Sequence, residues 1–217
     1  MTVKEHYDVI VVGGGPAGSV VASQLLAKSP SLSVLLIEAG DATQSALGGT
    51  FTHWTPFDVP FYWSHVAHLE AFHWNVSNTF IAKALGGCGI HNAMLYGTIV
   101  EIIPRFRLRL NTLVEKVNID DKHRAVSVNI RTSTGISSVI HATEAIVLTA
   151  GAIHTPKLLT LSGIASKNIL ADLGIPVVVD LPLVGNNLQD HPAIALLFQA
   201  QTPLDINFTY NFERCYI

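Results

Sequence analysis

The sequence predicts an α/β domain that combines a buried parallel sheet with a small antiparallel β-meander. The first observation is a β-α-β unit, in which an apolar, β-branched run at 7–12 leads through a glycine-rich turn into helical spacing over 19–28. A second apolar run at 32–38 completes the unit. The second observation is the alternating, β-branched texture of 105–148, which predicts successive strands.

The segments that we expect to form strands in this second region share β-branched residues and turn-like separators. They are RFRLRL, LVEKVNI, AVSVNIRT, SSVIHA and AIVLTA. We expect a meander that returns to a central strand. Residues 41–80 hold all three tryptophans and several prolines without a clear period, which indicates an irregular excursion. Beyond the meander we expect two short helices and a strand, at 155–162, 167–173 and 176–180.

Composition and charge argue against nucleic-acid and membrane partners. The 217 residues carry 13 Lys and Arg against 16 Asp and Glu, so no basic excess is present to neutralise phosphates, and we expect no nucleic-acid partner. No uninterrupted apolar run reaches the roughly 18 residues of a membrane helix, and we expect no membrane partner. The first eight residues contain no apolar signal core, which predicts a cytoplasmic location.

The glycine-rich turn carries the strongest functional signal. Gly13, Gly15 and Gly18 form a GxGxxG pattern, in which the glycines allow a tight turn, a close approach of a pyrophosphate and close helix packing. The following helix, whose start includes Pro16 and Ala17, would offer free N–H groups from Ala17 onward to phosphates. Glu38 ends the second strand, where a carboxylate can accept hydrogen bonds from a ribose. The pattern predicts dinucleotide binding, against the alternative of a structural turn.

A second glycine cluster follows the excursion. Gly86, Gly87 and Gly89 remove side chains at a place where a flat ring system could lie against the backbone. A tight loop without a ligand is the alternative interpretation of this cluster alone. The Glu38-Ala39-Gly40 sequence after the second strand favours FAD over NAD.

Four ordered motifs resemble the glucose–methanol–choline (GMC) oxidoreductases, flavoenzymes that oxidise alcohols. They are YDVIVVGGGPAG with LLIEAG, LGGCGIHNAMLYG, GAIHTPKLLTLSGI and LPLVGNNLQDHP. The resemblance implies a Rossmann-like FAD-binding domain of the glutathione-reductase type, with ββα and βαβ units. It also implies FAD as the cofactor, a small-molecule alcohol as substrate, and oxidation of CH–OH donors by hydride transfer to flavin N5.

The resemblance also implies which residues contact the cofactor. Asn92 to Leu95 match the segment that lines the flavin ring and pyrophosphate, and the backbone of Val114 matches the adenine contact. The expected cofactor-binding residues are Gly13, Gly15, Pro16, Ala17, Gly18, Glu38, Ala39, Gly86, Gly87, Cys88, His91, Asn92, Ala93, Met94, Leu95, Val114 and Gly151. No residue matches the family's catalytic histidine, so we assign no catalytic residue.

Two further histidine features leave alternatives open. His91 lies where some members of the family, including choline oxidases, carry a histidine joined covalently to the flavin; a packed histidine is the alternative. A cluster of His65, His68, Glu70 and His73 suggests a metal site, but its spacing fits no recognised ligand pattern, and we expect no metal.

The chain also departs from the family pattern. The family inserts a long stretch between Gly97 and Arg105, whereas this sequence has only a few residues there. We therefore expect an FAD-binding domain over 1–200, interrupted by a shortened excursion at 41–104. We expect a truncated start of the substrate domain, or a tail, at 201–217, with the substrate domain largely missing.

These departures leave three functions open. The first is an FAD-dependent oxidoreductase or a fragment of one. The second is a flavin-binding pseudoenzyme or subunit that lacks its own catalytic base and needs another chain or a missing C-terminal half. The third is a structural protein without flavin, which the retained glycines argue against, because glycines without a ligand only weaken a fold.

Overall fold

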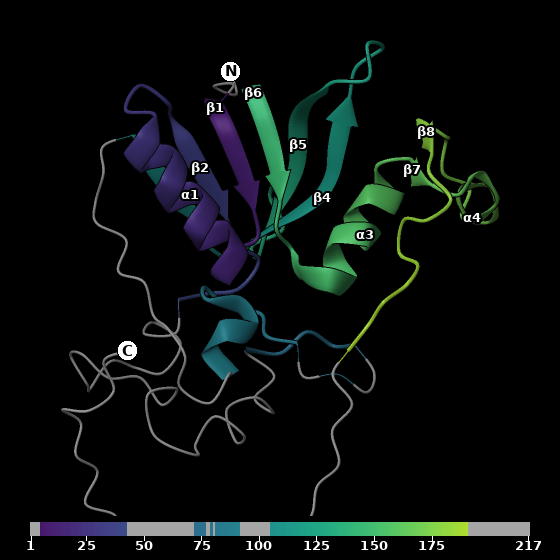
Figure 1. The fold of residues 1–217 in the computed structure, drawn as a ribbon, viewed down its shortest axis with the longest axis horizontal. Helices are drawn as coiled ribbons and strands as arrows, with labels where there is room; N and C mark the ends of the chain where they lie inside the picture. The colour runs from purple at the N-terminus through teal and green to yellow at the C-terminus, as the bar shows by residue number, and fades with distance from the viewer. Residues whose placement is uncertain (1–4, 43–71, 77–78, 80, 92–104, 191–217) are drawn as a thin grey trace, which may run out of the picture. The chain divides into compact units, whose positions relative to one another are not determined.

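The computed structural model describes residues 5–42, 72–76, 79, 81–91 and 105–190 (Figure 1). The fold lies in the first of two compact units, Met1–Asn187; the second is Leu188–Ile217. A six-stranded sheet in the order β3-β2-β1-β6-β5-β4 forms its centre. The strands are β1 (Glu5–Val12), β2 (Val34–Ile37), β3 (Phe106–Arg109), β4 (Thr112–Ile119), β5 (Ala125–Thr132) and β6 (Ser137–Leu148).

The two strands of the β-α-β unit are buried on both faces, as their continuous apolar sequences predict. Helix α1 (Pro16–Lys28) covers one face with Ala22 and Leu26 (Figure 1). On that face the strands present Val9, Val11, Val34 and Leu36. The alternate residues of the same strands, Ile10, Val12, Leu35 and Ile37, join a second core with residues of the meander and Leu158. The parallel strands therefore lie between two cores.

Strand β6 joins the parallel sheet to the meander. Its first residues, 137–141, pair antiparallel with β5, and residues 140–148 pair parallel with β1. The expectation of two separate strands, SSVIHA and AIVLTA, is therefore wrong. A single 12-residue strand runs through both, because the polar residues between the two apolar stretches lie on an exposed part of a continuous strand.

The first segment expected in the meander also has a different place. Residues 106–109 form β3, which pairs parallel with β2 at the edge of the sheet. The chain then turns at Asn111, which has a left-handed φ of 51°, and starts again as β4. Asn adopts this conformation more readily than most residues. The turn at Asn111 therefore separates the strand formed by the RFRLRL run from the antiparallel meander. The antiparallel meander thus consists of β4, β5 and β6.

The remaining elements follow the meander. Helix α3 (Gly151–Leu161) begins four residues before the expected 155 and continues through Pro156. Helix α4 spans Lys167–Asp172, close to the prediction. The expected strand at 176–180 is reduced to β8 (Val179–Asp180), which pairs with β7 (Ile164–Ala165). A 3-10 helix, η3, spans Gly87–His91. No helix among the described residues is long and apolar enough to span a membrane.

The buried hydroxyl of Ser162 links α3 to β4, which generates a stability prediction. The backbone N–H of Val117 donates to Ser162 Oγ at 2.9 Å, and Ser162 Oγ donates to the carbonyl of Leu158 at 2.7 Å. We expect Ser162→Ala to lower the free energy of unfolding by about 1–3 kcal/mol, because it leaves the buried N–H of Val117 without an acceptor. Urea unfolding followed by circular dichroism measures this.

Thr160→Ala is the matched control. Thr160 Oγ1 donates only to the carbonyl of Pro156, one turn back in the same helix. We expect this variant to stay within about 0.5 kcal/mol of the wild type. Equal losses for the two variants would contradict the bridging role of Ser162.

Candidate cofactor site

A cavity of about 630 Å³ lies at the carboxyl ends of three parallel strands. Val12 of β1, Ile37 of β2 and Leu148 of β6 line it. The starts of α1 and α3 line it as well, through Pro16, Ala17 and Gly151. Ligands of open α/β sheets bind in this position, outside the carboxyl ends of the strands where neighbouring connections diverge.

The three glycines of the first turn have different physical roles. Gly13 has a φ of 104°, and a Cβ there would lie 2.5 Å from the carbonyl oxygen of Thr149. A Cβ on Gly18 would lie 2.0 Å from the carbonyl oxygen of Gly13. Packing within the protein therefore requires both glycines. Gly15 differs, because its φ is −74° and a Cβ there would meet its nearest atom, Gly87 Cα, only at 3.8 Å.

Gly15 therefore lies in the cavity wall at a place where the packing of the protein itself leaves free space. Any residue could adopt its backbone conformation, and its own packing leaves room for a side chain. A side chain at this position would instead point into space that a ligand could use. This is the role that the GxGxxG pattern assigns to its second glycine.

Two helix N-termini supply the positive potential of the cavity. Neither α1 nor α3 has a side-chain hydrogen bond at its N-cap or an acidic residue in its first turn. Their first backbone N–H groups are available for an external acceptor, and the helix dipoles add partial positive charge at the same cavity. The lining also includes the cations Lys157 and Arg131 and the anions Glu38 and Glu115. An anionic group is favoured beside the two helix starts.

Glu38 is buried at the bottom of the glycine turn and is held by backbone N–H groups. The N–H of Gly14 donates to Oε2 at 2.8 Å, and the N–H of Gly40 donates to Oε1 at 2.8 Å. Burial raises the pKa of the Glu38 carboxyl above its ordinary value, although the N–H donors of Gly40, Gly14 and Ala39 oppose that rise. Each carboxylate oxygen retains a second lone pair, so the group can still accept a ribose hydroxyl.

The second glycine cluster packs directly on the first. The N–H of Gly86 donates to the carbonyl of Gly14 at 2.8 Å. A Cβ on Gly87 would lie 2.8 Å from Gly15 Cα, and one on Gly89 would lie 2.9 Å from Pro16 Cγ. Contact between the two glycine loops is thus enough to require these glycines. Gly87 and the exposed free thiol residue Cys88 line the cavity.

An aromatic contact that the sequence analysis missed forms another part of the wall. The rings of Trp74 and His154 lie 4.1 Å apart between centroids, and Lys83 Nζ lies 5.2 Å from the centre of the Trp74 ring. Burial and the nearby Lys157 ammonium lower the pKa of the His154 imidazole, which favours its neutral form. The contact joins the described end of the excursion to α3. His154 lies within the GAIHTPK motif, which is the signal that could have identified it.

The structure gathers most of the expected site residues. Those that line the cavity are Gly13, Gly15, Pro16, Ala17, Glu38, Ala39, Gly87, Cys88, Val114 and Gly151. Gly18 and Gly86 support the two glycine loops from outside the lining. His91 ends η3. Asn92, Ala93, Met94 and Leu95 lie outside the described residues. That these residues bind a cofactor stays a prediction at this point.

The suspected metal cluster falls largely outside the part of the chain that the structure describes. His65, His68 and Glu70 are not among the described residues. His73 is, and its Nε2 donates to the carbonyl of Thr79 at 2.7 Å. Within the described residues, no group of three or more His, Cys, Asp or Glu side chains could hold a metal ion.

Comparison with known protein families gives two matches. Residues 105–193 match the family model described as GMC oxidoreductase. Residues 8–59 match the model described as lycopene cyclase protein. This second stretch contains β1 from Asp8 onward, the first glycine turn, α1, β2 and Glu38, which belong to the β-α-β unit.

Curated relatives agree with the first match. The chain is 47% identical over 73 residues to the GMC oxidoreductase family protein Mala s 12 of Malassezia sympodialis, covering 34% of this chain and 12% of that protein. It is 41% identical over 109 residues to choline oxidase of Arthrobacter globiformis, covering 50% and 20%. It is 36% identical over 104 residues to the oxygen-dependent choline dehydrogenase of Escherichia coli, covering 48% and 18%.

Solved structures share the fold. Formate oxidase matches with a TM-score of 0.66 and 17% identity, over 83% of this chain and 51% of that one. Pyridoxine 4-oxidase from Mesorbium loti matches with a TM-score of 0.61 and 17% identity, over 81% and 55%. The chain thus spans about half the length of these structures. The match over residues 105–193 and the curated relatives agree with the resemblance of the four sequence motifs to the GMC oxidoreductases.

Proposed function

We propose that the chain binds FAD in the cavity between the two glycine loops and serves as the FAD-binding part of an oxidoreductase acting on the CH–OH group of donors. The observation that carries the proposal is Gly15. It lines the cavity, its own packing leaves room for a Cβ, and it stands at the N-terminus of a helix without a capping side chain. A pyrophosphate is the group that such a position accommodates.

The residues present fit the other parts of FAD. The first N–H groups of α1 would bind the pyrophosphate, with further positive potential from the start of α3. Glu38 would accept hydrogen bonds from the adenosine ribose through its remaining lone pairs. Val114 also lines the cavity, and its backbone would contact the adenine. The segment expected to line the flavin ring, Asn92 to Leu95, follows η3 directly in the sequence.

The chain's own residues would bind and orient the cofactor. When bound, FAD would accept a hydride from the alcohol carbon at N5. The closely packed glycine loops fix the backbone that the cofactor would contact, and Trp74 and His154 together form the cavity wall beside α3. An alcohol substrate and a cytoplasmic location are further parts of this proposal.

A second candidate is a flavin-binding chain that depends on another chain, or on a further half of the protein, for turnover. Five large apolar side chains between α4 and the loop after β8 favour it, because they are exposed: Ile169, Leu173, Val177, Leu181 and Leu183. Further protein that covers this region would remove their apolar surface from water. A turnover assay on flavin-loaded chain with small alcohols distinguishes the two candidates.

The visible spectrum of the purified chain tests the proposal. We expect flavin absorbance bands after purification or after reconstitution with FAD. A folded chain that stays colourless under both conditions would contradict FAD binding. Acid precipitation of the loaded protein then tests the covalent link through His91 that the resemblance implies. Colour in the pellet that is lost in His91→Ala supports the link, and colour in the supernatant contradicts it.

Substitution of the first-turn glycines separates cofactor binding from folding. We expect Gly15→Ala to fold, at a cost of at most about 1 kcal/mol for the weaker N-cap, and to bind FAD at least tenfold more weakly because its Cβ occupies the cavity. We expect Gly18→Ala to lose about 2 kcal/mol or more of stability, because its Cβ would overlap the Gly13 carbonyl oxygen. Thermal unfolding and FAD titration measure the two effects.

Gly135→Ala is the matched control for Gly15→Ala. Gly135 has a φ of 85° in the turn before β6, with no atom within 4 Å of its would-be Cβ and no place in the cavity lining. We expect it to lose about 1 kcal/mol through backbone strain and to keep wild-type FAD affinity. Wild-type flavin occupancy in Gly15→Ala would contradict the pyrophosphate assignment.

The raised pKa of Glu38 generates a pH prediction for the chain without FAD. The folded state binds this proton more tightly than the unfolded state, so the free energy of unfolding falls as pH rises from the ordinary value, 4.5, through the higher folded pKa. Glu38→Gln should remove this part of the pH dependence. Urea unfolding over a pH series, for the wild type and for Glu38→Gln, measures it.

A further inference from the structure

One end of the cavity carries an ion pair that the proposed function does not yet use. Arg131 of β5 and Glu115 of β4 both line the cavity, and Arg131 Nε donates to Glu115 Oε1 at 2.6 Å. Their side chains are 52% and 37% exposed. An ion pair this exposed contributes at most about 1 kcal/mol to folding, so stability alone does not explain its place at the cavity.

The local backbone directs the two side chains toward the cavity. Leu113 is the register partner of Arg131, and the pairing between β4 and β5 shifts between Val114 and Lys116. Glu115 therefore lies at a β-bulge, which bends the strand and changes the direction of the bulged side chain. At the bulge the carboxylate of Glu115 meets the guanidinium diagonally across the two strands, and both side chains remain at the cavity.

The position of this pair along the cavity defines which part of a dinucleotide it would meet. The backbone of Glu38 is tied to the start of β4, since the N–H of Thr112 donates to the carbonyl of Glu38 at 3.0 Å. Residues 112–115 of β4 then continue the cavity lining beyond Glu38 and Ala39. With the pyrophosphate at α1 and the ribose at Glu38, the base would lie over residues 112–115. This step rests on the proposed function.

We propose that Arg131, held in place by Glu115, stacks its guanidinium on the adenine of FAD and so selects for the dinucleotide. The hydrogen bond from Nε to Glu115 lies in the plane of the guanidinium and so does not itself occupy either planar face, and the Arg131 side chain is half exposed. A planar, weakly hydrated guanidinium stacks on an aromatic ring system, whereas a lysine ammonium does not offer a flat surface. Arg131 is thus a cofactor-binding residue, and Glu115 is a positioning residue that acts through it.

The experiment compares three probes by titration calorimetry on the full chain: FAD, ADP and FMN. FAD and ADP contain the adenine, whereas FMN contains the flavin without it. We expect Arg131→Met to raise the Kd of FAD and ADP by about 5- to 150-fold and to leave the Kd of FMN within about twofold, since base stacking on a side chain is worth about 1–3 kcal/mol. Glu115→Gln should give a smaller loss with the same pattern.

Arg131→Lys separates stacking from simple charge. It keeps the positive charge and loses the planar group, so we expect it to weaken ADP binding nearly as much as Arg131→Met does. Wild-type ADP affinity in Arg131→Lys would show that the charge attracts phosphate and would overturn the stacking. An equal loss for FMN and ADP in Arg131→Met would also overturn it, because a general structural defect gives that result.

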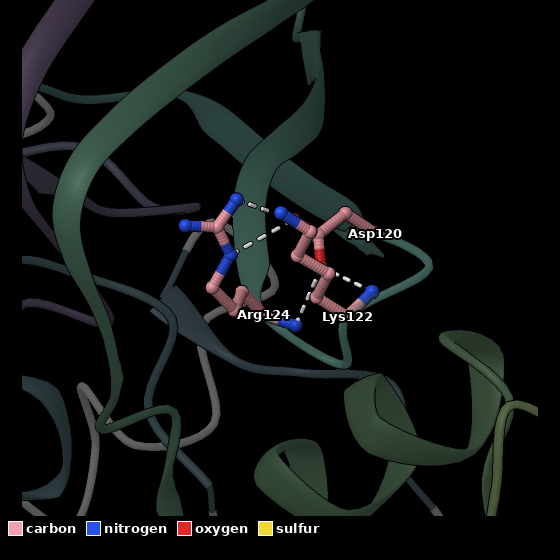
Figure 2. Close-up of polar contacts among 3 residues, drawn as sticks. All are labelled: Asp120, Lys122 and Arg124. Atoms are coloured by element: carbon pink, nitrogen blue, oxygen red, sulfur yellow. Dashed lines mark hydrogen bonds and ion pairs between the residues drawn. The ribbon is translucent and has the colours of Figure 1, made fainter.

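The same hairpin provides the matched control at its other end. Figure 2 shows Arg124 bound to Asp120, with Arg124 Nε and Nη2 at 3.0 and 2.8 Å from Asp120 Oδ2. The backbone N–H of Lys122 donates to the other oxygen of the same carboxylate at 3.0 Å (Figure 2). Arg124 also forms an exposed ion pair but does not line the cavity. We expect Arg124→Met to keep the wild-type Kd for all three probes.

The outcomes for the inference and for the proposed function are distinguishable. If the wild-type chain binds neither FAD nor ADP, the proposed function fails and the inference fails with it. If the wild type binds both and the Arg131 variants bind them equally well, the inference fails alone. Circular dichroism of each variant identifies any loss of fold, and Arg131→Lys provides the decisive comparison if Arg131→Met does not fold.

Discussion

The junction between the end of β1, the end of β6 and the start of α1 is the constraint on which the site depends. The N–H of Thr149 donates to the carbonyl of Val12 at 2.8 Å, and Thr149 Oγ1 lies 2.9 Å from the carbonyl oxygens of both Val12 and Gly13. Gly18 of α1 also packs tightly against the carbonyl of Gly13, which holds the start of the helix against the same turn. Three chain segments thus fix one turn, and both helix N-termini take their direction from it.

Glu38 extends this constraint to the second strand of the sheet. A buried carboxylate is unfavourable without hydrogen-bond donors, and here Gly14 and Gly40 each provide one. The side chain of Glu38 therefore joins the glycine turn to the end of β2 through contacts within the protein alone. One residue serves the fold and also presents its remaining lone pairs to the cavity. The raised pKa reflects this compromise between burial and hydrogen bonding.

The residues that could be predicted from the sequence are those whose chemistry is local. Glycine spacing, apolar runs and the acid at the end of β2 are local patterns, and the structure confirms the α/β class with its mostly parallel sheet. What could not be predicted depends on pairing between distant segments. The RFRLRL run alternates like any strand, and only its contact with β2 places β3 at the sheet edge. The Trp74–His154 contact and the Glu115–Arg131 pair form at the cavity only through tertiary structure. The GAIHTPK motif marks His154, but no sequence window shows either contact.

The shared strand β6 also has a consequence for how the chain acquires its fold. Its pairing with β5 is local in sequence, whereas Thr149 and Val12 are 137 residues apart. Closing so long a loop costs entropy that a local hairpin avoids, so the meander can form first and present an unpaired strand edge to β1. During synthesis the apolar β-α-β unit emerges long before this edge exists. Strand β1 lacks its β6 partner until residue 148 leaves the ribosome, so we expect this apolar unit to be prone to aggregation during synthesis.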